Sequence, residues 1–558
     1  MEQSSPANPL AGMAKLSQDM LSMFSQPERL IATQTKYATN MLSLWQRGFS
    51  AATTEESVEP VVSPSSSDKR WKDPQWQANL GFSLVQQAYL LTSDYMRELC
   101  QSMPIEDAHQ ADQLRFYTEQ VIAAMAPTNF PQTNPAVLSK TVECNGENLM
   151  AGYQNFMRDL DPDQGQLKIA MTDKSAFTIG ENIATTDGAV VFRNRMIELI
   201  QYAPSTGKVL KRPLMIVPPW INKFYILDLQ PKNSMIKWLV EQGHTVFVLS
   251  WVNPDASYRD VGFNNYMEEG IYAATDFICQ SLEVEQLNAI GYCIGGTLLS
   301  ATLAHMKAIG DKRIVSATFF TSMIDFAEPG ELGLFVDEPQ LQRLEAEMAE
   351  HGILKGQAMA STFNMLRAND LIWSFYVNNY LMGNQPPIFD LLYWNSDSTQ
   401  IPAATHSFYL RNMYQRNLLC QPGALQFNGV DIDISKVDIP VYFLSAQEDH
   451  IAPWKSTYAG AQLFAGDVTF VLGQSGHIAG VVNPPSADKY GYYTTDQLAP
   501  DADGWLESAS EHKGSWWMHW HDWVQGHNKV KVNARTVVPV DDSQASHAPG
   551  SYVKVRYD

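Results

Sequence analysis

The sequence predicts an α/β protein that is preceded by a mainly helical N-terminal domain. Residues 1–172 carry apolar side chains at helical spacing, which is typical of packed helices. From about residue 173 onward, short apolar runs alternate with helical stretches, and this alternation indicates a largely parallel sheet. Between about residues 325 and 435 the alternation stops for longer than an ordinary crossover requires. We therefore expect an insertion within a sheet domain that spans residues 173–558.

The composition excludes several classes of protein. The chain has 558 residues, of which 45% are hydrophobic, so it can build sizeable cores. Its formal net charge of −21 has the wrong sign for nucleic-acid binding. No apolar run approaches the roughly 20 residues of a membrane span, and the N-terminus lacks the plan of a signal peptide. We therefore expect a cytoplasmic protein with no nucleic-acid partner and no membrane span.

The cysteines and histidines predict neither a disulfide framework nor a metal site. The 5 cysteines are scattered without a C-x-x-C pair, which favours free thiols in a reducing compartment. His519 and His521 are the nearest approach to a metal site, but they lack cysteine or acidic partners at ligand spacing. We expect no metal and no bound cofactor.

The N-terminal domain is expected to have a loosely attached front end. Residues 8–50 form two amphipathic helical stripes, and residues 51–69 form a polar Ser/Pro/Glu segment that reads as a flexible linker. Helical periodicity resumes at residue 70. The side chains expected to be buried there include Trp71, Trp76, Phe116, Tyr117 and Val121.

The sheet domain contains six short apolar runs that we interpret as strands. The long insertion that follows the fourth run is rich in aromatic residues. We interpret it as a cap over an active site, and the alternative is an independent helical subdomain without a gating role. The six runs are residues 214–217, 246–249, 287–290, 315–320, 441–444 and 468–472.

The third run leads into a nucleophile elbow with cysteine at its centre. Gly291, Cys293 and Gly295 follow the G-x-S-x-G pattern, with cysteine where hydrolases carry serine. The nucleophile occupies a strained turn, so the residues two before and two after it cannot bear side chains. The helix that follows points its N-terminal N–H groups at the site, where they favour a thiolate. The alternative is a small buried cysteine at a strand–helix turn.

Asp449 and His477 follow the last two runs in the order expected of an α/β-hydrolase fold, in which the acid and then the histidine follow the nucleophile. A cysteine nucleophile needs a base, and the base needs an orienting group. We therefore predict that Cys293, His477 and Asp449 act together. Glu448 is the alternative acid, and His450 is the alternative base.

An oxyanion hole in this fold uses the N–H of the residue after the nucleophile and an N–H of the loop after the first strand. These positions correspond to Ile294 and to Ile221 in the loop of residues 218–223. The double proline of that loop could also serve only to stiffen a strand end.

From about residue 70 to its end, the chain resembles the poly(3-hydroxyalkanoate) synthases, and its full-length N-terminal domain resembles the single-subunit class I type. Six motifs in the same order carry the resemblance. They are residues 218–228 (PPWINKFYILD), 291–296 (GYCIGG), 389–395 (FDLLYWN), 448–451 (EDHI), 475–485 (SGHIAG and NPP) and 550–555 (GSYVKV).

The resemblance implies polymerisation of (R)-3-hydroxyacyl-CoA, typically 3-hydroxybutyryl-CoA, into a storage polyester with release of coenzyme A. It implies that Cys293 holds the acyl chain, that His477 is the general base and that Asp449 assists it. It also implies a homodimer on polyester granules, in contact with the nascent polymer and with granule-coat proteins. The resemblance further implies that Trp394 takes part in dimer contacts or in packing.

The chemistry of a thioester agrees with this expectation. Exchange of one thioester for another at Cys293 is nearly neutral, so the acyl group stays activated for transfer to a 3-hydroxyl. Two alternatives remain at the level of sequence. The first is a cysteine-dependent thioesterase or acyltransferase on the same fold, and the second is a non-catalytic granule or scaffold protein.

Overall fold

The computed structural model describes residues 27–54, 59–162 and 166–557. The chain divides into two compact units, and the first division falls after Asp173. The helical unit contains residues up to 173 together with residues 362–388, and the sheet unit contains residues 174–361 and 389–558. The apolar stripe expected between residues 8 and 26 lies outside the described residues.

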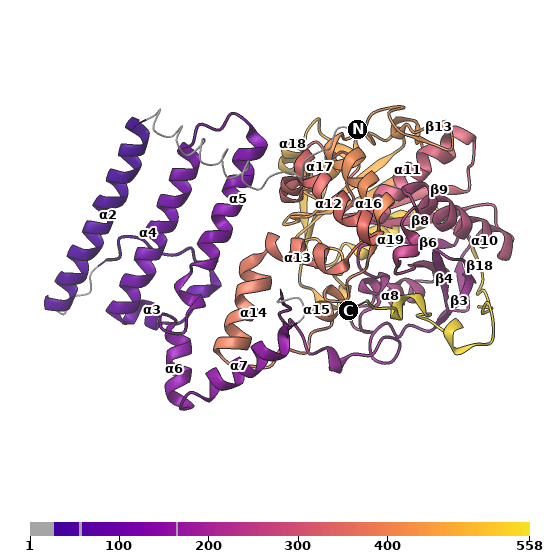
Figure 1. Ribbon diagram of the computed structural model, residues 1–558. Coiled ribbons are helices and arrows are strands. Elements are labelled where there is room, and N and C mark those ends of the chain that lie inside the picture. The colour runs from indigo at the N-terminus through magenta and orange to yellow at the C-terminus, as the bar shows by residue number, and fades with distance from the viewer. Residues whose placement is uncertain (1–26, 55–58, 163–165, 558) are drawn as a thin grey trace. The chain divides into compact units, whose positions relative to one another are not determined.

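The helical unit is built from long helices, and Figure 1 shows α2, α4 and α5 running side by side. Trp71, Trp76 and Phe116 are buried as expected. Tyr117 and Val121 are exposed instead, because they lie on a face of α5 that the described residues of this unit leave uncovered. The helices are α2 (Pro27–Thr54), α3 (Gln75–Ala78), α4 (Leu80–Ser102), α5 (Ala108–Ala124), α6 (Pro135–Glu143) and α7 (Glu147–Asp159).

The expected linker, residues 51–69, is shorter in the structure. Its first residues still belong to α2, which continues to Thr54. Residues 55–58 lie outside the described residues, and residues 59–68 contain neither helix nor strand. The backbone of this stretch is attached to α4, because the N–H of Val61 donates to the side chain of Gln87 at 2.7 Å.

Part of the expected cap belongs to the helical unit. Residues 362–388 contain η9 (Asn369–Trp373), α14 (Ser374–Tyr376) and η10 (Val377–Leu381), and η10 packs against α7. A Cβ atom on Gly152 of α7 would lie 1.8 Å from the carbonyl oxygen of Tyr380, so the two backbones meet directly. The Tyr380 hydroxyl donates to Asp159 at 2.8 Å. The insertion of residues 325–435 is therefore divided between the two units.

The sheet unit contains a ten-stranded sheet in the order β17-β16-β15-β14-β9-β8-β6-β7-β4-β3. The strands from β15 to β7 are parallel, and antiparallel pairs flank them at both edges. The six predicted runs are these parallel strands, and the α/β-hydrolase fold is confirmed. The bounds are β3 (Gly188–Arg193), β4 (Ile197–Tyr202), β6 (Leu214–Val217), β7 (Val246–Trp251), β8 (Leu287–Tyr292), β9 (Ile314–Phe320), β14 (Val441–Ala446), β15 (Val468–Gly473), β16 (Tyr492–Thr494) and β17 (Ser510–His512).

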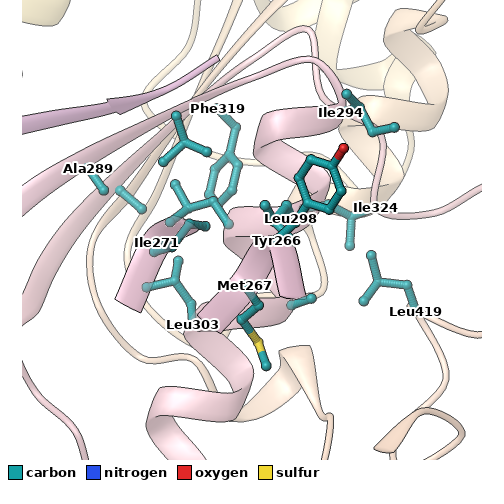
Figure 2. Packing of buried hydrophobic residues seen from close by; sticks show 14 of the residues in the cluster. Tyr266, Met267, Ile271, Ala289, Ile294, Leu298, Leu303, Phe319, Ile324 and Leu419 are labelled. Carbon is teal, nitrogen blue, oxygen red and sulfur yellow. The ribbon is translucent and has the colours of Figure 1, made fainter. Parts of the chain in front are cut away.

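The central strands are buried on both faces, which explains why they read as continuous apolar runs. Met215 and Val217 of β6 enter one hydrophobic cluster, whereas Leu214 and Ile216 enter another. The first cluster is covered by α11 (Ile294–Ile309), η7 (Tyr266–Tyr272) and α10 (Ala273–Ser281). Figure 2 shows Leu298 of α11 close to Tyr266 of η7. The second cluster is covered by α8 (Met235–Glu241) and α19 (Trp517–Gly526).

The rest of the insertion of residues 325–435 belongs to the sheet unit. Its helices include α12 (Glu338–His351), α15 (Asp390–Asn395), α16 (Ala403–Tyr409) and η11 (Leu410–Gln415). Within the described ranges, every helix is too short or too polar to span a lipid bilayer.

Candidate active site

Cys293 is the single residue between the end of β8 at Tyr292 and the start of α11 at Ile294. Its backbone has φ 52° and ψ −125°, a conformation that side-chain-bearing residues rarely adopt. A Cβ atom on Gly291 would lie 2.4 Å from the Cα of Gly296, and one on Gly295 would lie 2.3 Å from the carbonyl oxygen of Val217. The glycine spacing read in the sequence is therefore a requirement of this turn.

Asp449 and His477 lie on the loops that follow β14 and β15, and their side chains are hydrogen-bonded. Nδ1 of His477 lies 2.6 Å from Oδ2 of Asp449. The other carboxylate oxygen accepts the backbone N–H groups of Ile451 at 2.8 Å and of Ala452 at 2.9 Å. The carboxylate is buried and all of these bonds fix its orientation, so it holds the imidazole in one position.

The imidazole of His477 also lies close enough to Cys293 for the charge of the cysteine to act on it. Burial lowers the pKa of His477, but the charges of Asp449 and Cys293 outweigh burial and raise that pKa to about 10. The ring of Tyr292 stacks on the imidazole, with 5.9 Å between the ring centroids. The structure therefore brings the predicted cysteine, histidine and aspartate together in one row, with His477 hydrogen-bonded to Asp449 and next to Cys293.

The alternative acid and base have different surroundings. Glu448 is exposed, and its backbone N–H donates to the carbonyl of Ser475 at 2.9 Å. His450 is half-buried and follows Asp449 directly in the chain. Because the buried carboxylate of Asp449 is hydrogen-bonded to His477, the geometry favours Asp449 over Glu448 as the acid and His477 over His450 as the base.

The two predicted oxyanion donors lie on segments next to Cys293. Ile294 is the first residue of α11, where a backbone N–H has no carbonyl within the helix to bond. Ile221 lies in the loop after β6, between Trp220 and Asn222, which both bond to the hydroxyl of Thr399. The start of this loop reaches the elbow, because a Cβ atom on Gly295 would lie 2.6 Å from the carbonyl oxygen of Pro218.

Two tyrosines of the insertion, which sequence reasoning did not single out, lie near the cysteine. Burial raises the pKa of Tyr409 and of Tyr414, and the neighbouring charge of Cys293 raises both further. The two rings lie with their centroids 5.5 Å apart, and both pack against Phe326. The aromatic richness of the insertion was the signal for such contacts, but it could not indicate which rings approach the thiol.

The two histidines weighed as metal ligands have other partners. Nδ1 of His519 lies 3.0 Å from the hydroxyl of Tyr442, and Nδ1 of His521 lies 3.1 Å from Nε2 of His244. In the part of the chain that the structure describes, no group of three His, Cys, Asp or Glu side chains is arranged to hold a metal ion.

Two family models match the chain. Residues 67–239 match the N-terminal region of poly-beta-hydroxybutyrate polymerases, and residues 202–484 match the alpha/beta hydrolase fold.

Three relatives are similar over nearly their whole length. The chain is 48% identical to a poly(3-hydroxyalkanoate) polymerase of Methylorubrum extorquens over 533 residues, which cover 95% of this chain and 87% of that protein. It is 47% identical to the polymerase subunit of Rhizobium meliloti (strain 1021), with 99% of this chain and 90% of that protein covered. It is 41% identical to the polymerase subunit of Cupriavidus necator, with 95% of this chain and 89% of that protein covered.

Proposed function

The chain belongs to the poly(3-hydroxyalkanoate) polymerase family of acyl-transferring enzymes, and from this premise we propose that it polymerises (R)-3-hydroxyacyl-CoA through a thioester on Cys293. The family match supports the reaction, and the row formed by Cys293, His477 and Asp449 supports the mechanism. We assign the chain to the class I type that acts on short acyl chains, with 3-hydroxybutyryl-CoA as its main substrate. No separate cofactor takes part, because coenzyme A is the leaving group of the substrate.

Acylation uses the side chains of Cys293 and His477, while Asp449 holds the imidazole of His477 in position. His477 takes the proton of the Cys293 thiol, and the thiolate attacks the carbonyl carbon of the substrate thioester. The N–H groups of Ile294 and Ile221 stabilise the negative oxygen of the tetrahedral intermediate. The bond between carbon and the coenzyme A sulfur then breaks, His477 returns its proton to that sulfur, and Cys293 carries the acyl group.

Chain growth uses the same base in a second role. The 3-hydroxyl of an incoming (R)-3-hydroxyacyl-CoA loses its proton to His477 and attacks the thioester on Cys293. The carbon–sulfur bond to Cys293 breaks, an oxoester forms, and the proton of His477 returns to the cysteine sulfur. The lengthened chain, now on coenzyme A, is taken back by Cys293 with release of coenzyme A. Conversion of a thioester into an oxoester drives each addition.

The acyl-enzyme must survive until the next substrate arrives, so water has to be excluded from it. The buried rings of Tyr409 and Phe326 and the half-buried ring of Tyr414 line the neighbourhood of Cys293 with apolar surface. We propose that this aromatic group is the part of the insertion that limits hydrolysis.

We further propose that the protein is a cytoplasmic homodimer on polyester granules and that it meets granule-coat proteins there. One stripe of α2 supports contact with the polymer surface, since its large apolar side chains are exposed within the helical unit. Phe49 is 76% exposed and Trp45 is 61% exposed. The stripe consists of Ile31, Leu42, Trp45 and Phe49.

The test is an assay of the purified full chain with (R)-3-hydroxybutyryl-CoA, in which coenzyme A release and product size are both measured. We expect sedimentable polyester, loss of coenzyme A release in Cys293→Ala, and normal release in Cys279→Ala. Cys279 is a matched control because it is a half-buried thiol on α10, beside Arg313 and Asp311. Soluble 3-hydroxybutyrate as the sole product would reject the polymerase, and unchanged release in Cys293→Ala would reject the mechanism.

A further inference from the structure

The C-terminal segment, residues 550–556, is bound to two buried carboxylates of the sheet unit. The first is Glu198 of β4, whose side chain is fully buried. One of its oxygens accepts the N–H groups of Ser551 at 2.8 Å and Tyr552 at 2.9 Å, and the other accepts the Ser551 hydroxyl at 2.6 Å. A Cβ atom on Gly550 would lie 2.4 Å from Oε2 of Glu198. A residue with a side chain would therefore not fit at this point of the segment.

The second carboxylate is Asp397, which joins the C-terminal segment to Lys223. Nζ of Lys223 lies 2.7 Å from Oδ1 of Asp397, and Nε of Arg556 lies 3.1 Å from the same oxygen. The Tyr225 hydroxyl donates to the other oxygen at 2.9 Å. Nζ of Lys223 also donates to the carbonyl of Val555 at 2.9 Å. Because the ammonium group of Lys223 is buried, it depends on both of these partners.

Lys223 ends the loop of residues 218–223, which carries the N–H of Ile221. Trp394 also holds this end of the loop, since its Nε1 donates to the carbonyl of Lys223 at 2.6 Å. Trp394 is buried within the chain, so the structure gives this residue a packing contact. The end of the loop is thus fixed through its side chain and its backbone.

Both neighbours of Ile221 are bonded to one side chain, Thr399, which follows Asp397 by two residues. The Thr399 hydroxyl donates to the carbonyl of Trp220 at 2.7 Å and accepts the N–H of Asn222 at 2.9 Å. Asn222 has φ 66°, in the left-handed region, so the loop has a sharply defined turn at this point. The short segment that carries Asp397 and Thr399 therefore bonds to the loop at Trp220, Asn222 and Lys223.

We infer that Lys223, Asp397 and Arg556 are positioning residues for the oxyanion hole, and that the C-terminal segment completes the site by holding the loop in place. An oxyanion donor acts only when it is held close to the productive geometry, within a few tenths of an ångström. A change in the C-terminal segment should therefore slow the acyl-transfer step, although the segment acts on the loop only through Lys223 and Asp397. The inference rests on the proposed function, because it gives the Ile221 N–H a role in that reaction.

The test compares Lys223→Met and Arg556→Met with the parent protein. We expect both variants to lower kcat for coenzyme A release about tenfold, with KM changed by less than about twofold. We expect Cys293 to react with iodoacetamide at the parental rate, measured by mass spectrometry of its peptide. That reaction depends on the thiol and on His477, and it needs no oxyanion donor. Arg556→Lys keeps the positive charge beside Asp397 and should recover part of the lost kcat.

Arg212→Met is the matched control. Arg212 donates to the carbonyl of His527 and, at 3.0 Å, to Gln286, near the N-terminal end of β6 and thus at the end of the strand opposite the loop. We expect parental kcat in this variant.

The inference is overturned if Arg556→Met keeps its kcat within about twofold of the parent, or if kcat and the alkylation rate fall together. It is also overturned if Arg212→Met loses kcat as strongly. If Lys223→Met does not fold, Arg556→Met decides alone, since Arg556 is one-third exposed. Failure of the proposed function would be seen separately, as unchanged coenzyme A release in Cys293→Ala.

Discussion

Replacement of Asp449 by asparagine should switch the proton on His477 to the wrong nitrogen. The backbone N–H groups of Ile451 and Ala452 donate to one oxygen of the carboxylate, at 2.8 and 2.9 Å. In Asp449→Asn the same two N–H groups donate to the amide oxygen. The amide NH₂ group then faces Nδ1 of His477. An NH₂ group donates, so Nδ1 must then accept and the proton must move to the second ring nitrogen, which faces Cys293. A nitrogen that carries a proton cannot take the proton of the thiol.

The size of the effect follows from the bonds that are lost. The bond between Asp449 and the charged imidazole is 2.6 Å long and buried, and a charge-assisted bond of this kind contributes about 3 kcal/mol. This energy corresponds to a loss of roughly 100-fold in rate, and the misplaced proton increases the loss. We therefore expect Asp449→Asn to lower kcat for coenzyme A release by at least about 100-fold.

Glu448→Gln is the control for this experiment, because Glu448 precedes Asp449 in the chain and its side chain is exposed. The assay is steady-state coenzyme A release from (R)-3-hydroxybutyryl-CoA, with circular dichroism to establish that both variants are folded. We expect the control to retain activity within about twofold of the parent. A larger loss in Glu448→Gln than in Asp449→Asn would transfer the role to Glu448 and refute the reasoning.

Three further predictions concern the site and the surface. The pKa of His477 is raised to about 10, above the value of about 6.5 in an unfolded chain, so His477 contributes stability below pH 6.5 that is lost as the pH rises towards 10. The difference in melting temperature between the parent and His477→Gln should accordingly shrink across that range, and a constant difference would contradict the raised pKa. Gly295→Ala should destabilise the fold by at least about 2 kcal/mol in urea unfolding, because its Cβ would overlap backbone carbonyl oxygens; an unchanged midpoint would show that the turn relaxes. A Trp45→Ala and Phe49→Ala double variant should reduce sedimentation with polyester granules while coenzyme A release stays unchanged, and equal sedimentation would exclude this stripe as the attachment surface.

The proximity of Cys293, Asp449 and His477 could be predicted from the sequence because each of them follows a strand. Parallel strands present their C-terminal ends at one edge of a sheet, so the order of Cys293, Asp449 and His477 after three apolar runs was enough to place them together. The glycine spacing around Cys293 carried the same information locally, since the close approaches at Gly291 and Gly295 exclude any side chain. Local rules and the topology of the sheet agreed at this site.

The insertion and the C-terminal segment could not be predicted in the same way. The assignment of residues 362–388 to the helical unit depends on contacts with α7, from which they are separated by about 200 residues of chain. The buried group formed by Lys223, Asp397 and Arg556 joins three distant segments. No period or spacing links such residues, because their partnership is decided by tertiary packing alone. Motifs that contain Lys223 or lie just before Asp397 and Arg556 were visible in the sequence, but the contacts between these three residues were not.

In the mechanism that we propose, the choice between polymer and free acid depends on the insertion more than on the elbow. The row of Cys293, His477 and Asp449 activates any acceptor that reaches the thioester, and water is the most abundant acceptor in the cell. A hydrolase and a polymerase on this fold therefore differ in what surrounds the acyl-enzyme. Tyr409 and Tyr414 lie where they can exclude water from Cys293, and both belong to the part of the insertion that the sheet unit keeps. In the mechanism that we propose, the elbow makes the acyl group reactive, and the insertion limits the access of water to it.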